Sequence, residues 1–456
     1  MAPTRKIDVV LDSVKRLQRI GATANLFNLL QKQHPADLAA VLSELPERDR
    51  RAAFAVVVER APRLAMEAVA ELGPEMAGQL LADRSADEIA RLIEEIPSDD
   101  AAALIEHLPE ELSTAVLELM RPKESGQLEN LLEYPEKTAG RIMNPNVFAV
   151  PEELTVGEAI VELQAARDVE MVFYLYVVDV RRHLVGVTSL RRLLLVSPET
   201  PLKRIMTPEV ISVRVDTDQE EAAQIVASYN LLAVPVVDEE NKLVGVITVD
   251  DVIDVIKDEA TEDIYRLAGV TVDERVFTAP GESLTKRLPW LAINMVTAFL
   301  VASVVSLFEG TISQVVALAV FMPIVAGMGG NAGMQTLTVI VRGLALGELT
   351  FGNARKALLK EALVGLGNGV TLGAMGAVVV WVFRGDLVLG GVLALAMVIN
   401  MFIAATAGTL VPLGLRALRV DPALASSVFI TTFTDMAGFA SFLGLATIFL
   451  RYLGKG

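Results

Sequence analysis

The chain of 456 residues contains no cysteine and only three histidines. Without cysteine, a disulfide framework and a metal site built on thiolates are both excluded. The histidines, His34, His107 and His183, are scattered, and neither a nucleophile–His–acid pattern nor a phosphate-binding loop accompanies them. We therefore expect a protein that is not an enzyme.

Basic residues are scarce before residue 288, where 31 bases face 51 acids. Acids are scarce after it, where six acids face nine bases. An acidic region repels nucleic-acid phosphates, so we expect no nucleic-acid partner. Such a region attracts divalent cations, although a solvated acidic surface also favours solubility. The first 17 residues lack the apolar core of a signal peptide, so we expect no cleaved leader.

Hydrophobic residues make up 52% of the chain, with a mean hydropathy of +0.47, and the excess lies after residue 287. Five apolar segments there exceed the ~20 residues that a membrane helix needs. They are residues 288–308, 312–342, 354–383, 387–415 and 423–451.

The bases that flank these segments predict the orientation in the membrane. Eight fall on one side: Lys286, Arg287, Arg342, Arg355, Lys356, Lys360, Arg416 and Arg419. Three fall on the other side: Arg384, Arg451 and Lys455. Positive residues favour the cytoplasmic side, so we expect a multi-pass protein of the cell (inner) membrane, with a cytoplasmic N-terminus and an external C-terminus.

Two repeats occur before the membrane segments. In residues 1–135 a short unit recurs at 34–46, 85–97 and 98–109, each time beginning near a helix-capping residue and ending at proline. This pattern predicts stacked short helices in a superhelical domain, with a plain helical spacer as the alternative.

In residues 136–260, Arg141-Ile-Met143-Asn-Pro145 returns as Arg204-Ile-Met206-Thr-Pro208, and Leu184-Val-Gly-Val187 returns as Leu243-Val-Gly-Val246. The two copies resemble a pair of CBS domains, a family that often binds adenine nucleotides through a Ser/Thr followed three residues later by Asp. The second copy has Thr248 and Asp251, whereas in the first Ser189 is followed by Arg192. The resemblance implies ATP as a ligand of the second copy.

An acidic helix is predicted over residues 249–269. Asp251, Asp254, Asp258 and Glu262 share one of its faces, at spacings of three and four. Like charges at these spacings destabilise a helix. Neutralisation by bound divalent cations relieves the repulsion, and a solvated face is the alternative.

Asp435 is the only ionisable residue in the apolar stretch Ala423–Leu450. A carboxylate inside a membrane helix costs at least a few kcal/mol unless it meets water, a partner or an ion, so we interpret it as the ion site of a pore. The second apolar segment contains Pro323 and four glycines, beside the polar residues Asn331, Gln335 and Thr336. We expect this motif to interrupt the helix along a pore, with close helix packing as the alternative.

Together these features resemble the MgtE family of magnesium channels and transporters. The specific motifs are P-x-x-x-G-x-G-G-N-x-G-x-Q-T from Pro323 and T-D-x-x-G from Thr434. The resemblance implies a multidomain fold: an all-α superhelical N-terminal domain (1–135), an α/β CBS-domain pair (136–260), a connecting plug helix with its linker (249–287) and a five-helix transmembrane domain (288–456).

The resemblance also implies a homodimer in membrane lipid, with the pore between the subunits and a plug helix that closes it when cytosolic Mg²⁺ is high. Glu220 matches a sensor position, whereas Asn230 stands where an acid is expected. The implied Mg²⁺-binding residues are Asp435 in the pore, and Asp421, Glu259, Glu262, Asp263, Asp251, Asp254, Glu220, Glu95, Asp99 and Asp100. Gly330, Asn331 and Thr434 are the implied pore-lining residues.

Two other functions remain open on the sequence. An ion-coupled divalent-cation transporter or exporter would use the same membrane carboxylate for a coupling ion. A CBS-regulated anion channel is disfavoured, because a lone aspartate in the pore repels anions. The sequence does not distinguish Mg²⁺ from Mn²⁺ or Co²⁺.

Overall fold

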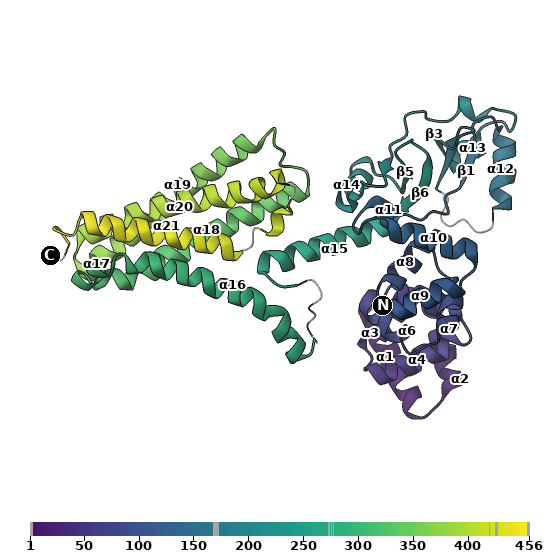
Figure 1. Ribbon diagram of the computed structural model, residues 1–456, viewed down its shortest axis with the longest axis horizontal. Helices are drawn as coiled ribbons and strands as arrows, with labels where there is room; N and C mark the ends of the chain where they lie inside the picture. The colour runs from purple at the N-terminus through teal and green to yellow at the C-terminus, as the bar shows by residue number, and fades with distance from the viewer. Residues whose placement is uncertain are drawn as a thin grey trace. The chain divides into compact units, whose positions relative to one another are not determined.

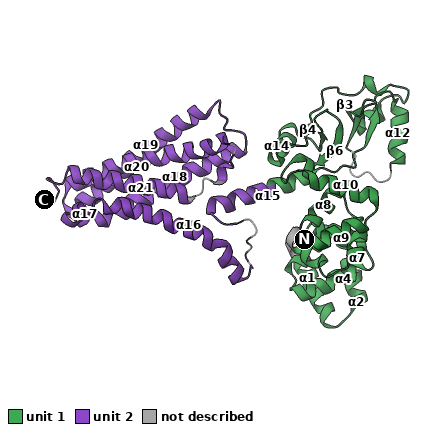
Figure 2. Ribbon diagram, in the orientation of Figure 1, with its two compact units in different colours: residues 1–256 green, residues 257–456 purple. Residues whose placement is uncertain are grey.

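The computed structural model describes residues 3–166, 173–271, 274, 276, 278–418, 420–424 and 427–453. They belong to two compact units, residues 1–256 and 257–456, each with its own hydrophobic core (Figure 2). The division falls inside helix α15, Val249–Ala268.

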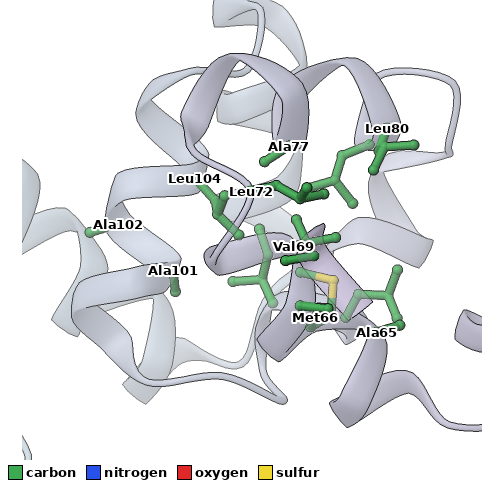
Figure 3. Close-up of a cluster of buried hydrophobic side chains, with 14 of the residues drawn as sticks. Ala65, Met66, Val69, Leu72, Ala77, Leu80, Ala101, Ala102 and Leu104 are labelled. Atoms are coloured by element: carbon green, nitrogen blue, oxygen red, sulfur yellow. The ribbon is translucent and has the colours of Figure 1, made fainter. Parts of the chain in front are cut away.

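The N-terminal part of the first unit is entirely helical over its described residues, as the sequence predicted. Its helices are α1 (Pro3–Arg19), α2 (Thr23–Leu30), α3 (Pro35–Glu44), α4 (Glu47–Val58), α5 (Pro62–Ala70), α6 (Pro74–Leu81), α7 (Ala86–Ile93), α8 (Ser98–Glu106), α9 (Glu110–Leu119) and α10 (Pro122–Glu133). Proline stands at or just before the start of most of them, where its missing N–H costs nothing. Figure 3 shows how α5, α6 and α8 bury Met66, Val69, Leu80 and Leu104 among themselves.

Two small sheets follow, one in each CBS-like copy (Figure 1). The strands are β1 (Ala149–Pro151), β2 (Tyr174–Val178), β3 (Leu184–Ser189), β4 (Val213–Arg214), β5 (Ala233–Val237) and β6 (Leu243–Thr248). The helices are α11 (Ala139–Ile142), α12 (Val156–Ala165), α13 (Leu190–Leu195), η1 (Leu202–Arg204) and α14 (Gln219–Tyr229). In each sheet the first two strands are parallel and the last two antiparallel.

The methionine of each copy packs against the glycine of the other copy. A Cβ on Gly245 would lie 2.5 Å from the Sδ of Met143, and a Cβ on Gly186 would lie 2.5 Å from the Sδ of Met206. Each methionine therefore packs on the strand of the copy that it does not precede. This exchange gives a packing reason for the two short motifs that recur together in the sequence.

The second unit contains five helices long and apolar enough to cross a membrane, as predicted. Its elements are α16 (Pro280–Ser306), α17 (Glu309–Gln314), α18 (Ala317–Ala345), α19 (Ala354–Arg384), α20 (Leu387–Ala417), η2 (Pro422–Leu424) and α21 (Ser427–Ile448). Helix α16 begins earlier than the apolar segment suggested, with Pro280 at its first position, where the missing N–H costs nothing. Figure 1 shows α18, α20 and α21 side by side.

The long helices alternate in direction, which gathers most of the flanking bases at one end of the bundle. Arg342 closes α18, Arg355 and Lys356 open α19, and Arg416 closes α20. The Arg416 guanidinium donates to the backbone oxygen of Leu349, at 3.1 Å, and so ties the end of α20 to the α18–α19 loop. Arg419 and Lys455, which entered the orientation argument, lie outside the described residues.

Candidate functional site

The carboxylate of Asp435 lies in the third turn of α21 and is half-buried. Among the described residues it has neither an ion pair nor a hydrogen-bond partner. An ionised group in an apolar bundle is costly without such a partner. Asp435 is therefore suited to a mobile ligand of opposite charge.

Helix α18 packs against the turn of α21 that precedes Asp435. A Cβ on Gly333 would lie 2.6 Å from Cγ2 of Ile430, and one on Gly330 would lie 3.3 Å from Cγ2 of Thr431. The motif glycines thus allow two helix backbones to approach closely. The expected interruption is wrong for this chain, since α18 continues through Pro323 and all four glycines.

The polar residues near this contact divide into two groups. Asn331 and Gln335 are exposed on α18. Thr434 is fully buried, and its hydroxyl donates to the backbone oxygen of Thr431 in its own helix, at 3.0 Å. Thr434 and the buried Gly330 therefore lie where α21 packs on α18, and their expected place along a pore stays a prediction. Asn331, which we had also expected there, is the accessible member of that set.

Asn400 of α20 is a buried polar residue that the sequence reasoning missed. Its side chain is 1% exposed, and Nδ2 donates to the backbone oxygen of Val325 in α18, at 2.9 Å. Its Oδ1 is buried and has no partner among the described residues. An unpaired buried amide oxygen costs about 1–3 kcal/mol. Its signal in the sequence was a lone amide within an otherwise apolar segment.

Glu361 of α19 is a second buried membrane carboxylate that the sequence reasoning did not single out. It is 4% exposed, forms an ion pair with Lys360, and accepts a hydrogen bond from the Thr336 hydroxyl at 3.2 Å. Unlike Asp435, Glu361 has both an ion pair and a hydrogen bond. Its position as the only acid in the third apolar segment was the signal that could have found it.

At the other end of the bundle, Arg266 joins α15 to the start of α21. Its guanidinium forms ion pairs with both Glu262 and Asp421. Glu262 is only 8% exposed, and the other oxygen of Asp421 accepts from the Ala423 N–H at 2.8 Å. An arginine thus holds together two of the predicted Mg²⁺ ligands. Glu259 and Asp263 lie on the same helix and are partly exposed.

The end of α15 also packs on the first membrane helix. Gly269 ends the helix in a left-handed conformation, and a Cβ there would lie 1.8 Å from Nε1 of Trp290. Trp290 meets Phe429 of α21 edge-on, with ring centroids 6.1 Å apart. The end of α15 is therefore linked to α21 through the Trp290 side chain of α16.

In the first unit, Asp99 of α8 lies close to Asp251 of α15. Burial, with the charges of Asp251 and Asp100, raises the pKa of the Asp99 carboxyl well above its usual range. Burial raises the pKa of Asp251 to about 6, although hydrogen bonds from Thr248 oppose the shift. The amide of Asn144 reaches Asp99 at 3.5 Å. Among the described residues neither Asp99 nor Asp251 forms an ion pair, so both carboxyls favour either a proton or a cation.

The remaining predicted ligands are more dispersed. Glu95 lines a cleft of about 450 Å³ with Ser98 and Asn144, Asp254 is exposed, and Glu220 lies in the first turn of α14. Asn230, in place of the expected acid, ends α14 at a φ of +52°, which asparagine tolerates well. Within the described residues, no three acids or histidines lie close enough to hold a metal ion by themselves.

The nucleotide-type residues adopt matching geometry in the two copies. Ser189 accepts from the Arg192 N–H at 3.3 Å, capping α13, and Thr248 stands at the same place before α15. The Thr248 hydroxyl donates to Asp251 at 2.6 Å. The second copy alone therefore offers the hydroxyl–carboxylate pair of the CBS pattern.

Family models match most of the chain. The intracellular N domain of MgtE matches residues 33–137, CBS domains match residues 139–199 and 202–258, and a divalent cation transporter domain, MgtE, matches residues 322–445.

Solved structures resemble the first part of the chain. The soluble part of a magnesium transporter is 31% identical, with a TM-score of 0.50, and covers 56% of this chain and 99% of its own. The cytosolic domain of the Mg²⁺ channel MgtE in complex with ATP is 36% identical, with a TM-score of 0.51, and covers 54% and 99%.

Curated relatives extend over most of both chains. The magnesium transporter MgtE of Thermus thermophilus is 40% identical over 336 residues, which is 73% of this chain and 74% of the relative. That of Enterococcus faecalis is 41% identical over 331 residues, 72% and 73% of the two chains. That of Bacillus subtilis is 38% identical over 339 residues, 73% and 74%. With its five apolar helices, the chain is a multi-pass membrane protein that belongs to the MgtE family of divalent cation transporters.

Proposed function

We propose that this chain forms a Mg²⁺-selective channel of the cell membrane that cytosolic Mg²⁺ closes. The observation that carries the proposal is the half-buried Asp435, a membrane carboxylate without an ion pair or hydrogen bond among the described residues. Three curated relatives are named magnesium transporters, and one solved relative is named a Mg²⁺ channel.

A single aspartate per subunit suits Mg²⁺ when a two-fold axis doubles it. Mg²⁺ is small, prefers six oxygen ligands and loses water reluctantly. Two Asp435 carboxylates across a homodimer axis would hold its water shell without removing it. The exposed Asn331 would add an amide oxygen near the same path.

An ion-coupled carrier is the second candidate, and Glu361 is the observation that favours it, because coupling requires a further titratable membrane group. Glu361 already has Lys360 and Thr336 as partners, so it is better explained as a structural group than as a coupling site. We therefore prefer the channel.

The gate lies at the bundle end that carries most of the bases, which positive-inside asymmetry assigns to the cytoplasm. In the closed state α15 is held near the start of α21 by Arg266 between Glu262 and Asp421. Bound Mg²⁺ would strengthen this contact through Glu259, Glu262, Asp263 and Asp421. Loss of Mg²⁺ would leave more acids than the one arginine can neutralise.

The acids of residues 1–135 and 136–260 form the sensing part. Asp99, Asp100 and Asp251 repel one another without a cation, by about 2–3 kcal/mol for a pair several Å apart at an effective dielectric near 20. Mg²⁺ removes this repulsion and so favours the compact arrangement. Asp254, Glu95 and Glu220 would add ligands at the margins of the sensing part.

The Asp435→Asn substitution tests the pore directly. We expect a folded protein with greatly reduced Mg²⁺ flux into liposomes, because the charge that attracts the ion is gone while the side-chain volume is kept. Asp386→Asn is the matched control. Asp386 caps α20 by accepting the N–H groups of Val388 and Leu389, a task that asparagine performs equally well. Wild-type flux in the Asp435 variant would remove the basis of the proposal.

Nucleotide binding is expected to depend on the second CBS copy. Calorimetry with ATP on residues 1–270 should detect binding that Asp251→Ala abolishes, since the hydroxyl–carboxylate pair with Thr248 is lost. Ser189→Ala serves as the control and should bind as wild type. Binding that survives Asp251→Ala unchanged would exclude the second-copy site.

The raised pKa of Asp251 predicts a pH dependence of stability without Mg²⁺. A carboxyl whose folded pKa exceeds its unfolded value stabilises the fold when protonated, and this contribution is lost as pH rises through about 6. Asp251→Asn should therefore raise the unfolding midpoint of residues 1–270 by a few degrees at pH 7.5, with little change at pH 4.

Asp216→Asn is the control for this measurement, because the ion pair with Arg214 lowers the Asp216 pKa. This variant should gain no stability at the higher pH. Equal effects of Asp251→Asn at both pH values would contradict the account of a buried, repelled carboxylate.

The gate is tested by replacing Glu259, Glu262 and Asp263 together with alanine. Conduction should persist, whereas inhibition by cytoplasmic Mg²⁺ should need a higher concentration, as measured by patch recording. Thr261→Ala is the control on the same helix, since its exposed hydroxyl bonds only to the Lys257 backbone. Closure of the triple variant at the wild-type Mg²⁺ concentration would mean that sensing lies elsewhere.

A further inference from the structure

Asn400 joins three helices of the membrane unit. It belongs to α20, its Nδ2 donates to the Val325 oxygen of α18 at 2.9 Å, and its side chain is 1% exposed. Two glycines on neighbouring helices make room for it. A Cβ on Gly329 of α18 would lie 2.2 Å from Nδ2, and one on Gly438 of α21 would lie 2.6 Å from it. The amide therefore fills the space that these two glycines leave.

Both glycines belong to the motifs that carry the ion site. Gly329 immediately precedes Gly330 and Asn331 on α18, and Gly438 follows Asp435 by three residues, about one helical turn. The contact through Asn400 thus fixes α21 against α18 one turn from the unpaired carboxylate.

Stability alone does not explain an asparagine at this position. Its Oδ1 is buried and unpaired in the described part of the unit. A leucine has the same number of side-chain heavy atoms, with the same branching at Cγ, and contains no polar atom to desolvate, so it would occupy an apolar helix contact at a lower desolvation cost. A residue that lowers the free energy of unfolding is expected to persist where function requires it.

We propose that Asn400 is a positioning residue for the ion site: it sets the separation of α18 and α21 so that Asp435 and the Gly330-Asn331 motif act on the same ion. The inference rests on the proposed role of Asp435. Asn400 acts through helix placement, since its one bonded donor is engaged with Val325.

The test is Mg²⁺ flux into liposomes by full-length Asn400→Leu protein, with the unfolding midpoint measured in parallel. We expect the half-saturating Mg²⁺ concentration to rise roughly tenfold, as for outer residues that orient metal ligands. The unfolding midpoint should stay equal or increase. Met397→Leu is the matched control, because Met397 lies on the same helix about one turn earlier and is buried in the hydrophobic core of the membrane unit. It should leave both quantities unchanged.

A half-saturating Mg²⁺ concentration equal to that of the wild type in Asn400→Leu would overturn the inference. If the unfolding midpoint also falls in that variant, Asn400 has only a packing role. If the leucine variant does not fold, Asn400→Ala decides by the same half-saturation, because alanine fits the same space. Asp435→Asn in the same assay separates the two proposals. If that variant loses flux while Asn400→Leu behaves as wild type, only the role of Asn400 fails; if it keeps full flux, the proposed function fails.

Discussion

The carboxylate of Asp435 within an apolar helix bundle is the constraint on which the rest of the membrane unit depends. Three buried or half-buried polar side chains in this bundle differ in the number of hydrogen-bond and ion-pair partners they have. Glu361 has a lysine and a hydroxyl as partners, Asn400 has one bond and one unpaired oxygen, and Asp435 has no partner among the described residues. The two side chains with the fewest partners, Asn400 and Asp435, both lie near the contact of α18 with α21. Polar groups that the fold leaves unsatisfied are expected where a ligand completes them.

The acidic regions outside the bundle follow the same electrostatic rule in two ways. Near the start of α21, Arg266 pairs with both Glu262 and Asp421, so one positive charge offsets only part of two negative charges. At the contact of α8 with α15, burial, with like charges nearby, raises the pKa values of Asp99 and Asp251. Both places therefore carry acids whose charge a bound cation would offset.

The sequence predicted the parts of this fold that depend on local pattern. The helical spacing and the units that end at proline predicted the short helices, the duplicated motifs predicted the strands, and the apolar segments predicted the long helices. The family resemblance was confirmed. It predicted contacts poorly. Arg266 is 155 residues from Asp421, and Asn400 meets helices that begin far from it in the chain. The glycine motif of α18 was misread as an interruption, because glycine serves a kink and a close helix contact equally well in sequence. The assignment of ion ligands to particular acids remains a prediction.

The most direct measurement of the central claim uses the wild-type protein in liposomes, with Mg²⁺, Na⁺ and Cl⁻ fluxes compared under the same gradients. A pore built around unpaired carboxylates predicts Mg²⁺ flux that far exceeds the flux of Na⁺ and Cl⁻, needs no coupling ion, and falls when Mg²⁺ is raised on the side of residues 1–270. Flux of Mg²⁺ only in the presence of a Na⁺ or proton gradient, or a dominant Cl⁻ flux, would contradict it.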